Sequence, residues 1–541
     1  MYLCYDIKGI QQFIFSVPRL KCVIGASGII VAFDTWAKER AAVLYGVETI
    51  FAAGGRGAFF CHDTPDQVIA EQLEQELIEE AWSFGLDLRI GLDDDLTRAL
   101  NRADRLYPYT EVDDSGRAEP CAMSGLWPVV PGEGEGPKGN IHPLIWERVQ
   151  RSGSDELGQW ILDGLRNGGW LPRQLYGFDL QFFKNISPHP DDEDEDREEA
   201  KAAQKALGSR NRWAVIAMDG NDMGRQFLAF ASLGEDAGSK RDLLKHMSRA
   251  LEDCTNRALF RALSHTINLW ARDVEASDVK LETYCVPGSN RLVLPFRPLV
   301  LGGDDVTMLC HPSYAMAFVR AMAEGFREIS TTSTVEPRWP ATQGELTMSA
   351  GILYTKVSFP LHMTVPYAER LLDNVKDAFR IVDPDANIPA PAGVDWDTMT
   401  DTLIEDPTVR RRRELCFRDD DINVDVQLTR RPYLIEAPEE DPRSLKALLN
   451  LKYDLVNAKI APSVLANILP GLQRPWHERV AFIASIAKRH QLLMTYLWED
   501  GPRVGRGWEK NEDNTHRCTG VPDALLLLEE EHRMTQSTVG D

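Results

Sequence analysis

The feature that most constrains the fold is a four-residue turn, GGDD at 302–305, between two apolar runs. The runs RPLVL (297–301) and VTMLC (306–310) have the composition of buried strands. Glycine permits positive φ and a close approach of a ligand to the backbone. The segment therefore predicts a tight β-hairpin that carries two carboxylates at its tip.

A second hairpin of this kind near the N-terminus indicates an internal duplication. FAAGGRGAFFC (51–61) aligns with VLGGDDVTML (300–309), and upstream of each an apolar strand ends in an aspartate, Asp6 or Asp219. The matched pairs are Gly54-Gly55 with Gly302-Gly303 and Arg56-Gly57 with Asp304-Asp305. Chance is the alternative, because Gly-Gly turns between apolar strands are common. The same order of elements around both turns favours duplication.

Each copy reads as strand, helix, strand, turn, strand, helix, strand. This order predicts an α+β protein with two divergent, tandem ferredoxin-like domains, at 1–92 and 206–395. Residues 93–205 are rich in Pro, Gly and Asp, so we expect an irregular region with an acidic linker, DDEDEDREE (191–199). Residues 396–541 carry mostly helical patterns and predict a helical C-terminal domain.

Composition limits the partners and the compartment. The 541 residues include 60 Lys and Arg against 83 Asp and Glu, a formal net charge of −23. Extensive binding of nucleic acid depends on Lys and Arg, so we do not expect this chain to coat nucleic acid by itself. Local contacts with nucleic acid, or nucleic acid held by partner subunits, stay open. The nine cysteines form no C-x-x-C pair, so no zinc is expected. Without a signal peptide or an 18-residue apolar run, we expect a cytoplasmic protein that does not bind membranes.

The two aspartates of the turn predict a divalent-metal site. Two carboxylates about 4 Å apart repel by about 4 kcal/mol at an effective dielectric of about 20, and a bound cation removes that cost. Oxygen ligands alone suit two Mg²⁺ or Mn²⁺ ions. Asp219 ends the strand beside the hairpin and is the expected third ligand, after Asp304 and Asp305. A solvated turn is the alternative.

Two metal ions at such a site can activate a ribose 3′-hydroxyl and stabilise a leaving pyrophosphate. The sequence therefore favours nucleotide joining at the second hairpin. Arg56-Gly57 of the first hairpin cannot ligate a metal. We expect the first domain to hold a nucleotide without ions of its own.

Further residues are candidates for nucleotide binding, each with a structural alternative. Lys376 lies on a helix and meets a triphosphate or is a surface lysine. Ser27 opens a helix, where free amides favour phosphate, or simply caps it. Ser349 lies on a strand, and its hydroxyl contacts the ligand or has an internal partner. Gly302 and Gly303 bring the backbone close to the ligand. The basic run 410–413 reads as a solvated cluster, with RNA or a partner as the alternative.

With these residues placed, the chain resembles the large subunit of type III CRISPR effector complexes, the Csm/Cmr polymerase–cyclase family. The segments that carry the resemblance are DIKGIQQFIFS, MDGNDMG, LGGDDVTML, SAGI and AERLLDNVK. It implies two Palm domains, of which the GGDD-bearing one converts ATP into cyclic oligoadenylates. It also implies Asp219, Asp304 and Asp305 as metal ligands and a second ATP near Ser27. Other effector subunits, guide RNA and target RNA are the implied partners.

The sequence departs from the family in two respects. Many members begin with an HD nuclease domain, whereas here the first Palm-like pattern starts at residue 1, so no HD nuclease activity is expected. Many carry a cysteine zinc module between the Palms, where this chain has only Cys121. Two other functions stay open: a stand-alone cyclic dinucleotide synthetase of GGDEF type, and a mainly scaffolding subunit.

Overall fold

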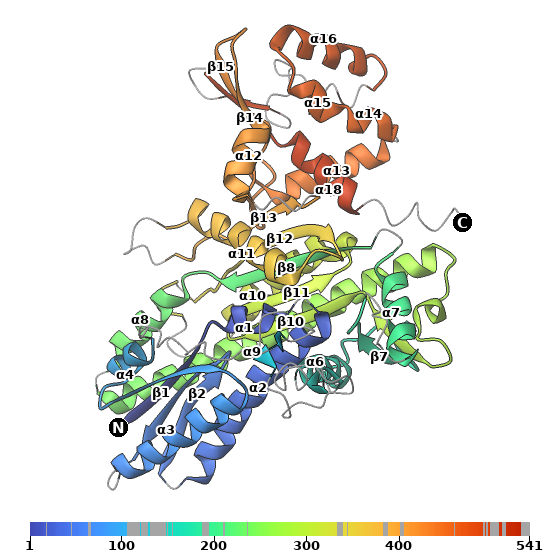
Figure 1. Cartoon of the computed structure of the whole chain (residues 1–541). Coiled ribbons are helices and arrows are strands. Elements are labelled where there is room, and N and C mark those ends of the chain that lie inside the picture. Colours follow the sequence, from blue (N-terminus) through green and yellow to red (C-terminus); the bar gives the residue numbers. More distant parts are fainter. Residues whose placement is uncertain are drawn as a thin grey trace.

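The computed structural model of the chain is an α+β structure with two similar lobes and a C-terminal module at the opposite end from the first lobe (Figure 1). The residues that it describes are 1–17, 19–44, 46–62, 66–104, 119–120, 128–129, 148, 150–153, 155–186, 194–208, 211–234, 236–332, 339–342, 344–381, 388–400, 405–458, 460–490, 493, 496–497, 508–510 and 515–531.

The first lobe is an antiparallel four-stranded sheet in the order β2–β3–β1–β4. Alternate residues of its central strand, Leu3, Tyr5 and Ile7, are buried in one core with side chains of the two long helices. This is the period-two pattern of a strand inside a sheet. The elements of this lobe are β1 (Tyr2–Lys8), α1 (Ile10–Phe15), α2 (Leu20–Val43), β2 (Val47–Ala53), β3 (Arg56–Cys61), α3 (Asp66–Ser83), β4 (Asp87–Asp93) and α4 (Leu96–Ala103).

The second lobe repeats this sheet as β10–β11–β8–β12 and extends it with β13 and β16. Its two hairpin strands carry a register shift between Pro298 and Val300, and the first-lobe hairpin carries one between Thr49 and Phe51. The predicted pair of ferredoxin-like sheets is confirmed. The elements are β8 (Arg212–Gly220), α8 (Met223–Leu233), α9 (Ala237–Ala276), β10 (Phe296–Gly302), β11 (Asp305–Cys310), α10 (Pro312–Thr331), β12 (Met348–Lys356), α11 (Leu361–Ala378), β13 (Gly393–Thr398) and β16 (Tyr433–Leu434).

The two lobes pack on each other reciprocally. Helix α2 of the first lobe contacts β10 of the second, and helix α9 of the second lobe contacts β2 of the first. At the second contact Lys245 of α9 lies 2.5 Å from Glu48 of β2. The hairpins of both lobes consequently face each other across a shared interface.

The region between the lobes is more regular than we expected. Helix α6 (Glu156–Asn167) and strand β7 (Asp179–Phe182) lie within it, and β7 pairs in parallel with β9 (Arg291–Leu294). From Asp194 onward the acidic run is the start of helix α7 (Asp194–Ala206) and not a linker. Its first-turn carboxylates are favoured by the positive end of the helix dipole, which explains the error.

Helix α2 corrects the expectation that no segment is long and apolar enough to span a membrane. By length and composition alone Leu20–Val43 qualifies, but 67% of its most apolar window is buried inside the structure. Buried residues along it, among them Val23, Ile30 and Phe33, belong to the core shared with the first-lobe sheet. The helix is therefore accounted for as a core helix of this lobe.

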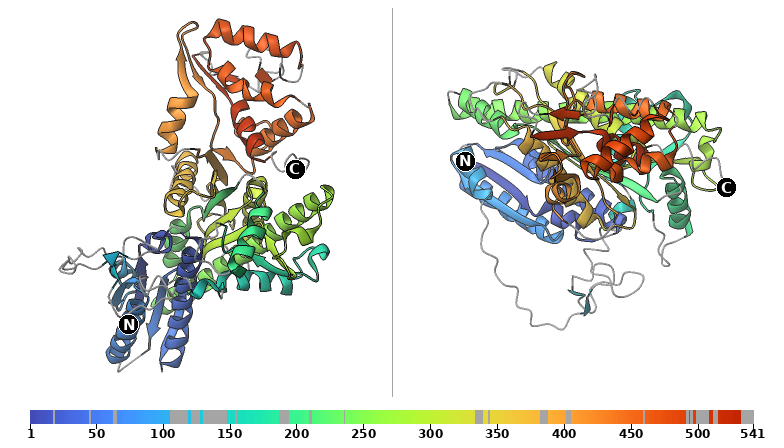
Figure 2. Two further views of the ribbon diagram at one scale, coloured as in Figure 1. Left: turned by 45° about the vertical axis from the view of Figure 1, so that its right-hand side comes forward. Right: turned by 90° about the horizontal axis from the view of Figure 1, so that it is seen from above.

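The C-terminal module is mostly helical, as predicted, but it also contains a four-stranded sheet in the order β14–β15–β18–β17. Its strands are three or four residues long, too short for a pattern of alternation to be recognised. Figure 2 shows the module beyond the second lobe, away from the first. Its elements are α12 (Pro407–Leu415), β14 (Cys416–Asp419), β15 (Val424–Gln427), α13 (Leu445–Asn457), α14 (Pro462–Ala466), α15 (Ile468–Leu472), α16 (Trp476–Ala487), β17 (Trp508–Lys510), β18 (His516–Thr519) and α18 (Val521–Glu531).

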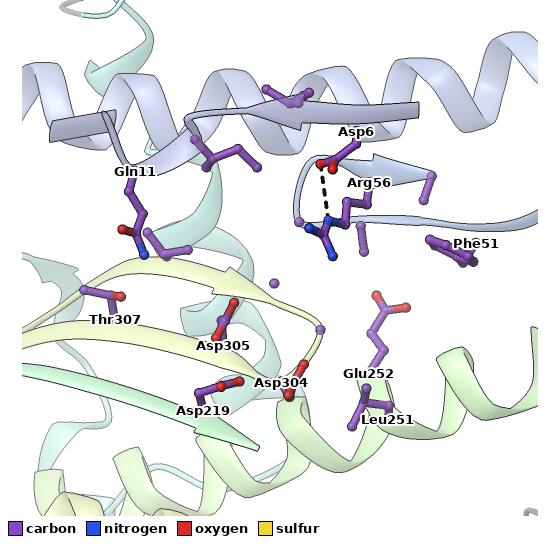
Figure 3. A pocket seen from close by; sticks show the side chains of 18 of the residues that line it. Asp6, Gln11, Phe51, Arg56, Asp219, Leu251, Glu252, Asp304, Asp305 and Thr307 are labelled. Atoms are coloured by element: carbon purple, nitrogen blue, oxygen red, sulfur yellow. Dashed lines mark hydrogen bonds and ion pairs between the residues drawn. The ribbon is translucent and has the colours of Figure 1, made fainter. Parts of the chain in front are cut away.

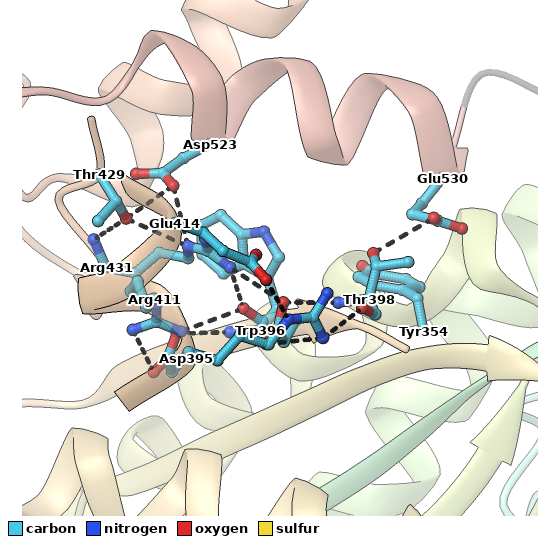
Figure 4. A network of polar contacts seen from close by, with 12 residues as sticks. Tyr354, Asp395, Trp396, Thr398, Arg411, Glu414, Thr429, Arg431, Asp523 and Glu530 are labelled. Atoms are coloured by element: carbon cyan, nitrogen blue, oxygen red, sulfur yellow. Dashed lines mark hydrogen bonds and ion pairs between the residues drawn. The ribbon is translucent and has the colours of Figure 1, made fainter. Parts of the chain in front are cut away.

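Buried ion pairs join the module to the second-lobe sheet (Figure 4). Arg411 of α12 binds both carboxylate oxygens of Asp395 on β13, at 2.7 and 2.9 Å, and the Asp395 side chain is fully buried. Arg431, beside β16, donates to Asp523 of α18 at 2.9 Å. The basic run at 410–413 is therefore not wholly a solvated cluster, because Arg411 is an internal partner of the sheet.

Candidate active site

The three predicted metal ligands lie together at the edge of the second-lobe sheet that faces the first lobe (Figure 3). Met218 of β8 pairs with Val306 of β11, so Asp219 lies next to Asp305 on the neighbouring strand. Asp304 occupies the turn before β11. The Asp219 carboxylate interacts electrostatically with both of the other carboxyl groups.

Burial controls the charge of this cluster. It raises the pKa of Asp305 to about 8 and that of Asp304 well above its usual range, and the nearby Asp219 carboxylate adds to both shifts. Burial also favours the neutral form of Asp219, but the Lys376 ammonium and the hydrogen bonds from its neighbours hold the pKa of Asp219 below its usual value. A bound cation would therefore stabilise the charged forms of these carboxyl groups.

Lys376 is at the site and not on the open surface. Its ammonium forms an ion pair with Asp219 and donates to the Gly220 carbonyl at 3.1 Å. Helix α11 also carries Glu369 and Asp373 at the wall of the cavity. Asp373 follows Glu369 by four residues and precedes Lys376 by three. Burial raises the pKa of Glu369 to about 7, with a further contribution from Asp373.

A cavity of about 1050 Å³ lies between the lobes in front of these carboxylates. Ligand pockets usually measure about 300–1,000 Å³, so this one has the size for more than one nucleotide. The first lobe, α8 and α9 supply basic and apolar residues to its wall. They include Lys8, Lys38, Phe51, Arg56, Phe227 and Arg249. The cavity is therefore acidic on the second-lobe side and carries basic groups on the opposite side.

The tips of the two hairpins touch at glycines. A Cβ atom on Gly302 would lie 2.9 Å from the Cα of Gly54, which is closer than real Cβ contacts. Gly303, in contrast, has open space around it and a φ of +62°, which an L-residue adopts only with strain. The first glycine of GGDD thus permits the contact between lobes, and the second permits the turn.

The strand register corrects our alignment of the two hairpins by one residue. The closing pair is Ala53 with Arg56 in the first and Gly302 with Asp305 in the second. Arg56 therefore occupies the position of Asp305, and it pairs with Asp6 of the neighbouring strand β1. Our alignment of the sequences superimposed the identical glycines. The structural alignment is instead set by the residue pairs that the strands form, Ala53 with Arg56 and Gly302 with Asp305.

The residues fit a divalent cation in donor type and in charge. The donors are carboxylate oxygens, and three carboxyl groups face one ammonium. Within the described residues, no group of three or more His, Cys, Asp or Glu side chains is positioned to hold a metal ion by itself. This is the usual situation for Mg²⁺, which binds one or two carboxylates and completes its shell with water and substrate phosphates.

Ser27 is placed differently from our expectation, and Ser349 has the internal partner that was its structural alternative. Ser27 lies inside α2, which begins at Leu20, so it has no free helix-start amides, and it is not among the residues that line the cavity. The small residues around it serve packing, because a Cβ on Gly25 would collide with the backbone of Arg148. Ser349, opposite Asp219 on β12, accepts a hydrogen bond from the Gly393 amide at 3.3 Å. Cys121 lies outside the described residues, and the absence of zinc stays a prediction.

Several cavity residues were not predicted from the sequence. Glu369 and Asp373 precede the predicted Lys376 at the spacing of one helix face, which is a usable signal. Ser248, Arg249 and Glu252 lie within about one turn of α9, but nothing local distinguishes them from a solvated helix face. Their contribution depends on the packing of α9 against the other lobe.

Comparison with known proteins agrees with this site. Residues 212–380 match the sequence model of the Cas10/Cmr2 second palm domain, and this segment contains all three aspartates and Lys376. The resemblance to the large subunit of type III CRISPR effector complexes is thereby confirmed over the second lobe. No curated protein matches the sequence.

Solved structures provide more distant similarities. A Csm1–Csm4 cassette in complex with cA3 is 15% identical, with a TM-score of 0.47, over 98% of this chain and 69% of that one. The same kind of cassette with pppApApA is 16% identical, with a TM-score of 0.46, over 98% and 69%. Csm1 in T. onnurineus is 14% identical, with a TM-score of 0.41, over 100% and 70%.

Proposed function

We propose that this chain is a nucleotidyltransferase that converts ATP into 3′–5′ cyclic oligoadenylates. We also propose that it acts in the cytoplasm as the large subunit of a type III CRISPR RNA-guided complex, with other effector subunits, guide RNA and target RNA as partners. One observation carries the proposal: Asp219, Asp304 and Asp305 meet at a cavity that both lobes line. The palm-domain match over the same segment supports it.

The proposed reaction joins two nucleotides within the shared cavity. The 3′-hydroxyl oxygen of one ATP forms a bond with the α-phosphorus of another, pyrophosphate leaves with the electrons of the broken bond, and the hydroxyl proton passes to solvent. Repetition extends the chain, and attack by the last 3′-hydroxyl on the first α-phosphorus closes the ring as the remaining pyrophosphate leaves. The two facing lobes hold the reactants side by side, which supplies most of the rate advantage through orientation.

Individual residues have separate parts in this proposal. Asp219, Asp304 and Asp305 would hold two Mg²⁺ or Mn²⁺ ions, which when bound neutralise phosphate charge and activate the hydroxyl. Lys376 neutralises Asp219 and is placed to bind a phosphate of the nucleotide at the same carboxylates. Gly303 keeps the turn free of a side chain where the nucleotide approaches.

The test is mass spectrometry of the products formed from ATP with Mg²⁺ or Mn²⁺, with and without matching target RNA. Asp304→Ala combined with Asp305→Ala should abolish the cyclic product while the thermal unfolding profile stays intact. The matched control is Asp420→Ala with Asp421→Ala, an exposed aspartate pair between β14 and β15, which should leave turnover unchanged. Unchanged turnover in the Asp304 and Asp305 variant would refute the proposal. Replacing ATP by GTP tests the GGDEF-type alternative, which expects cyclic guanylates.

A further inference from the structure

The strand registers place an arginine in the first lobe where the second lobe has a metal-binding aspartate. Asp6 pairs with Arg56 across β1 and β3, just as Asp219 lies beside Asp305 across β8 and β11. In the second lobe the facing side chains are both acidic and need a cation. In the first lobe the second side chain is itself the cation.

The charge of Asp6 is already satisfied by protein groups. Arg56 donates from Nε to one carboxylate oxygen at 3.2 Å, and Lys8 binds the other at 2.5 Å. Asp6 is 6% exposed, so no further ligand reaches it easily. The first lobe therefore has no carboxylate left for a divalent ion at this position.

The guanidinium of Arg56 is only partly used by this pairing. Its side chain is 66% exposed and lines the cavity between the lobes (Figure 3). The Nε contact with Asp6 is its one hydrogen bond within the described residues, so both terminal nitrogens are uncommitted. Two parallel N–H groups of a guanidinium match two oxygens of a phosphate, and an ion pair at Nε leaves that pair of groups free.

Other charges in the cavity agree with a phosphate near Arg56. Lys38 and Arg249 line the same cavity. Glu252 of α9 points into this space, and within the described residues no hydrogen bond or ion pair joins it to Arg56 (Figure 3). Asp104, which does not line the cavity, interacts electrostatically with Arg56 from the first lobe. The second-lobe carboxylates lie across the cavity, where a polyphosphate is repelled unless cations are bound.

We propose that Arg56 binds the phosphates of a nucleoside triphosphate on the first-lobe side of the cavity and there replaces the divalent cations of the second lobe. This inference rests on the proposed function, because it assigns the position of the second nucleotide. Binding on the first-lobe side does not require metal, whereas binding at Asp219, Asp304 and Asp305 does. The two halves of the duplicated site thus use different cations for the same ligand.

The experiment is calorimetric titration of the whole chain with ATP in a buffer containing EDTA. The wild-type chain should bind ATP without metal, and Arg56→Gln should weaken this binding about 10- to 100-fold, the effect of losing a charged hydrogen-bonding partner. Arg56→Lys should recover part of the affinity. The matched control is Arg89→Gln, because Arg89 faces Asp6 from β4 but does not line the cavity.

A double variant, Asp304→Asn with Asp305→Asn, separates this inference from the proposed function. Binding in EDTA should persist in that variant, whereas cyclic product should disappear. If ATP binds Arg56→Gln as tightly as the wild-type chain, or if no binding occurs in EDTA, the inference is wrong even when the wild-type chain makes product. If product never forms but the EDTA binding depends on Arg56, the proposed function fails and this inference stands. Matching thermal unfolding curves verify that each variant is folded.

Discussion

The contact between Gly54 and Gly302 gives a prediction that can be worked out from the structure. Gly302→Ala adds a Cβ atom 2.9 Å from the Gly54 Cα, whereas carbon atoms in contact prefer about 3.5–4.0 Å. Because both atoms belong to backbone or begin a side chain, no rotamer change relieves the clash. The hairpins must therefore separate by about 0.6–1.1 Å. The φ of Gly302 is not positive, so the alanine introduces no turn strain of its own.

The expected effects on stability and rate differ in size. Overpacking of this kind costs about 1–3 kcal/mol, so the protein should stay folded. A displacement of about 1 Å between two reactants held by opposite lobes should lower the rate of their joining by about 100-fold. Gly302→Ala should therefore retain a folded structure and lose most of its cyclic product.

The assay is the initial rate of product formation from ATP, measured beside thermal unfolding. Gly28→Ala is the matched control, because a Cβ at this position in α2 meets nothing within 4 Å. It should leave the rate unchanged. A Gly302→Ala chain that unfolds like the wild type and makes product at the wild-type rate would show that the glycine contact does not set the spacing of the lobes.

Two further predictions concern buried charges. Arg411→Met should lower the free energy of unfolding by about 3–5 kcal/mol, because it leaves Asp395 buried without its partner, whereas the exposed neighbour Arg413→Met should cost less than about 1 kcal/mol; equal melting temperatures for the two variants would contradict this. Burial raises the pKa of Asp34 to about 6 from 3.8, although Tyr5 and the Gly55 amide hydrogen-bond to it. Because the folded pKa is the higher one, the folded state binds more protons than the unfolded state between these two pKa values. The stability that the protonated Asp34 side chain contributes is therefore complete below about pH 4 and is lost as the pH rises through about 6. Asp34→Asn should lose less stability than the wild type between pH 4 and pH 7 in thermal unfolding, and parallel pH profiles would show that Asp34 does not titrate in this way.

The strand order and the carboxylate cluster were predictable because their signals are local. An apolar strand that ends in aspartate, followed later by a hairpin with two more aspartates, places Asp219 beside Asp305 in any sheet of this topology. The family resemblance over residues 212–380 rests on the same segments. The ion pair of Lys376 with Asp219 was harder to predict from the sequence, because it requires α11 to cross the end of β8.

The errors came from information that a sequence pattern does not contain. Matching glycines misplaced Arg56 by one position, because hairpin register is set by the ladder of hydrogen bonds. Ser27 was assigned to a helix start from its small neighbours, whereas the helix begins seven residues earlier and the small residues accommodate a neighbouring backbone. The residues of α9 at the cavity depend on contacts between lobes, which no local pattern encodes.

The buried ion pairs between the C-terminal module and the second lobe restrict which motions the protein can make. Arg212, the first residue of β8, lies 3.0 Å from Glu530 of α18, so the module is attached to the very strand whose far end carries Asp219. Separating the module from the second lobe would leave several buried charges without their partners. We therefore expect a partner that docks on the module to shift β8 together with it. The cavity between the lobes would then widen or narrow as the second lobe moves with the module against the first lobe.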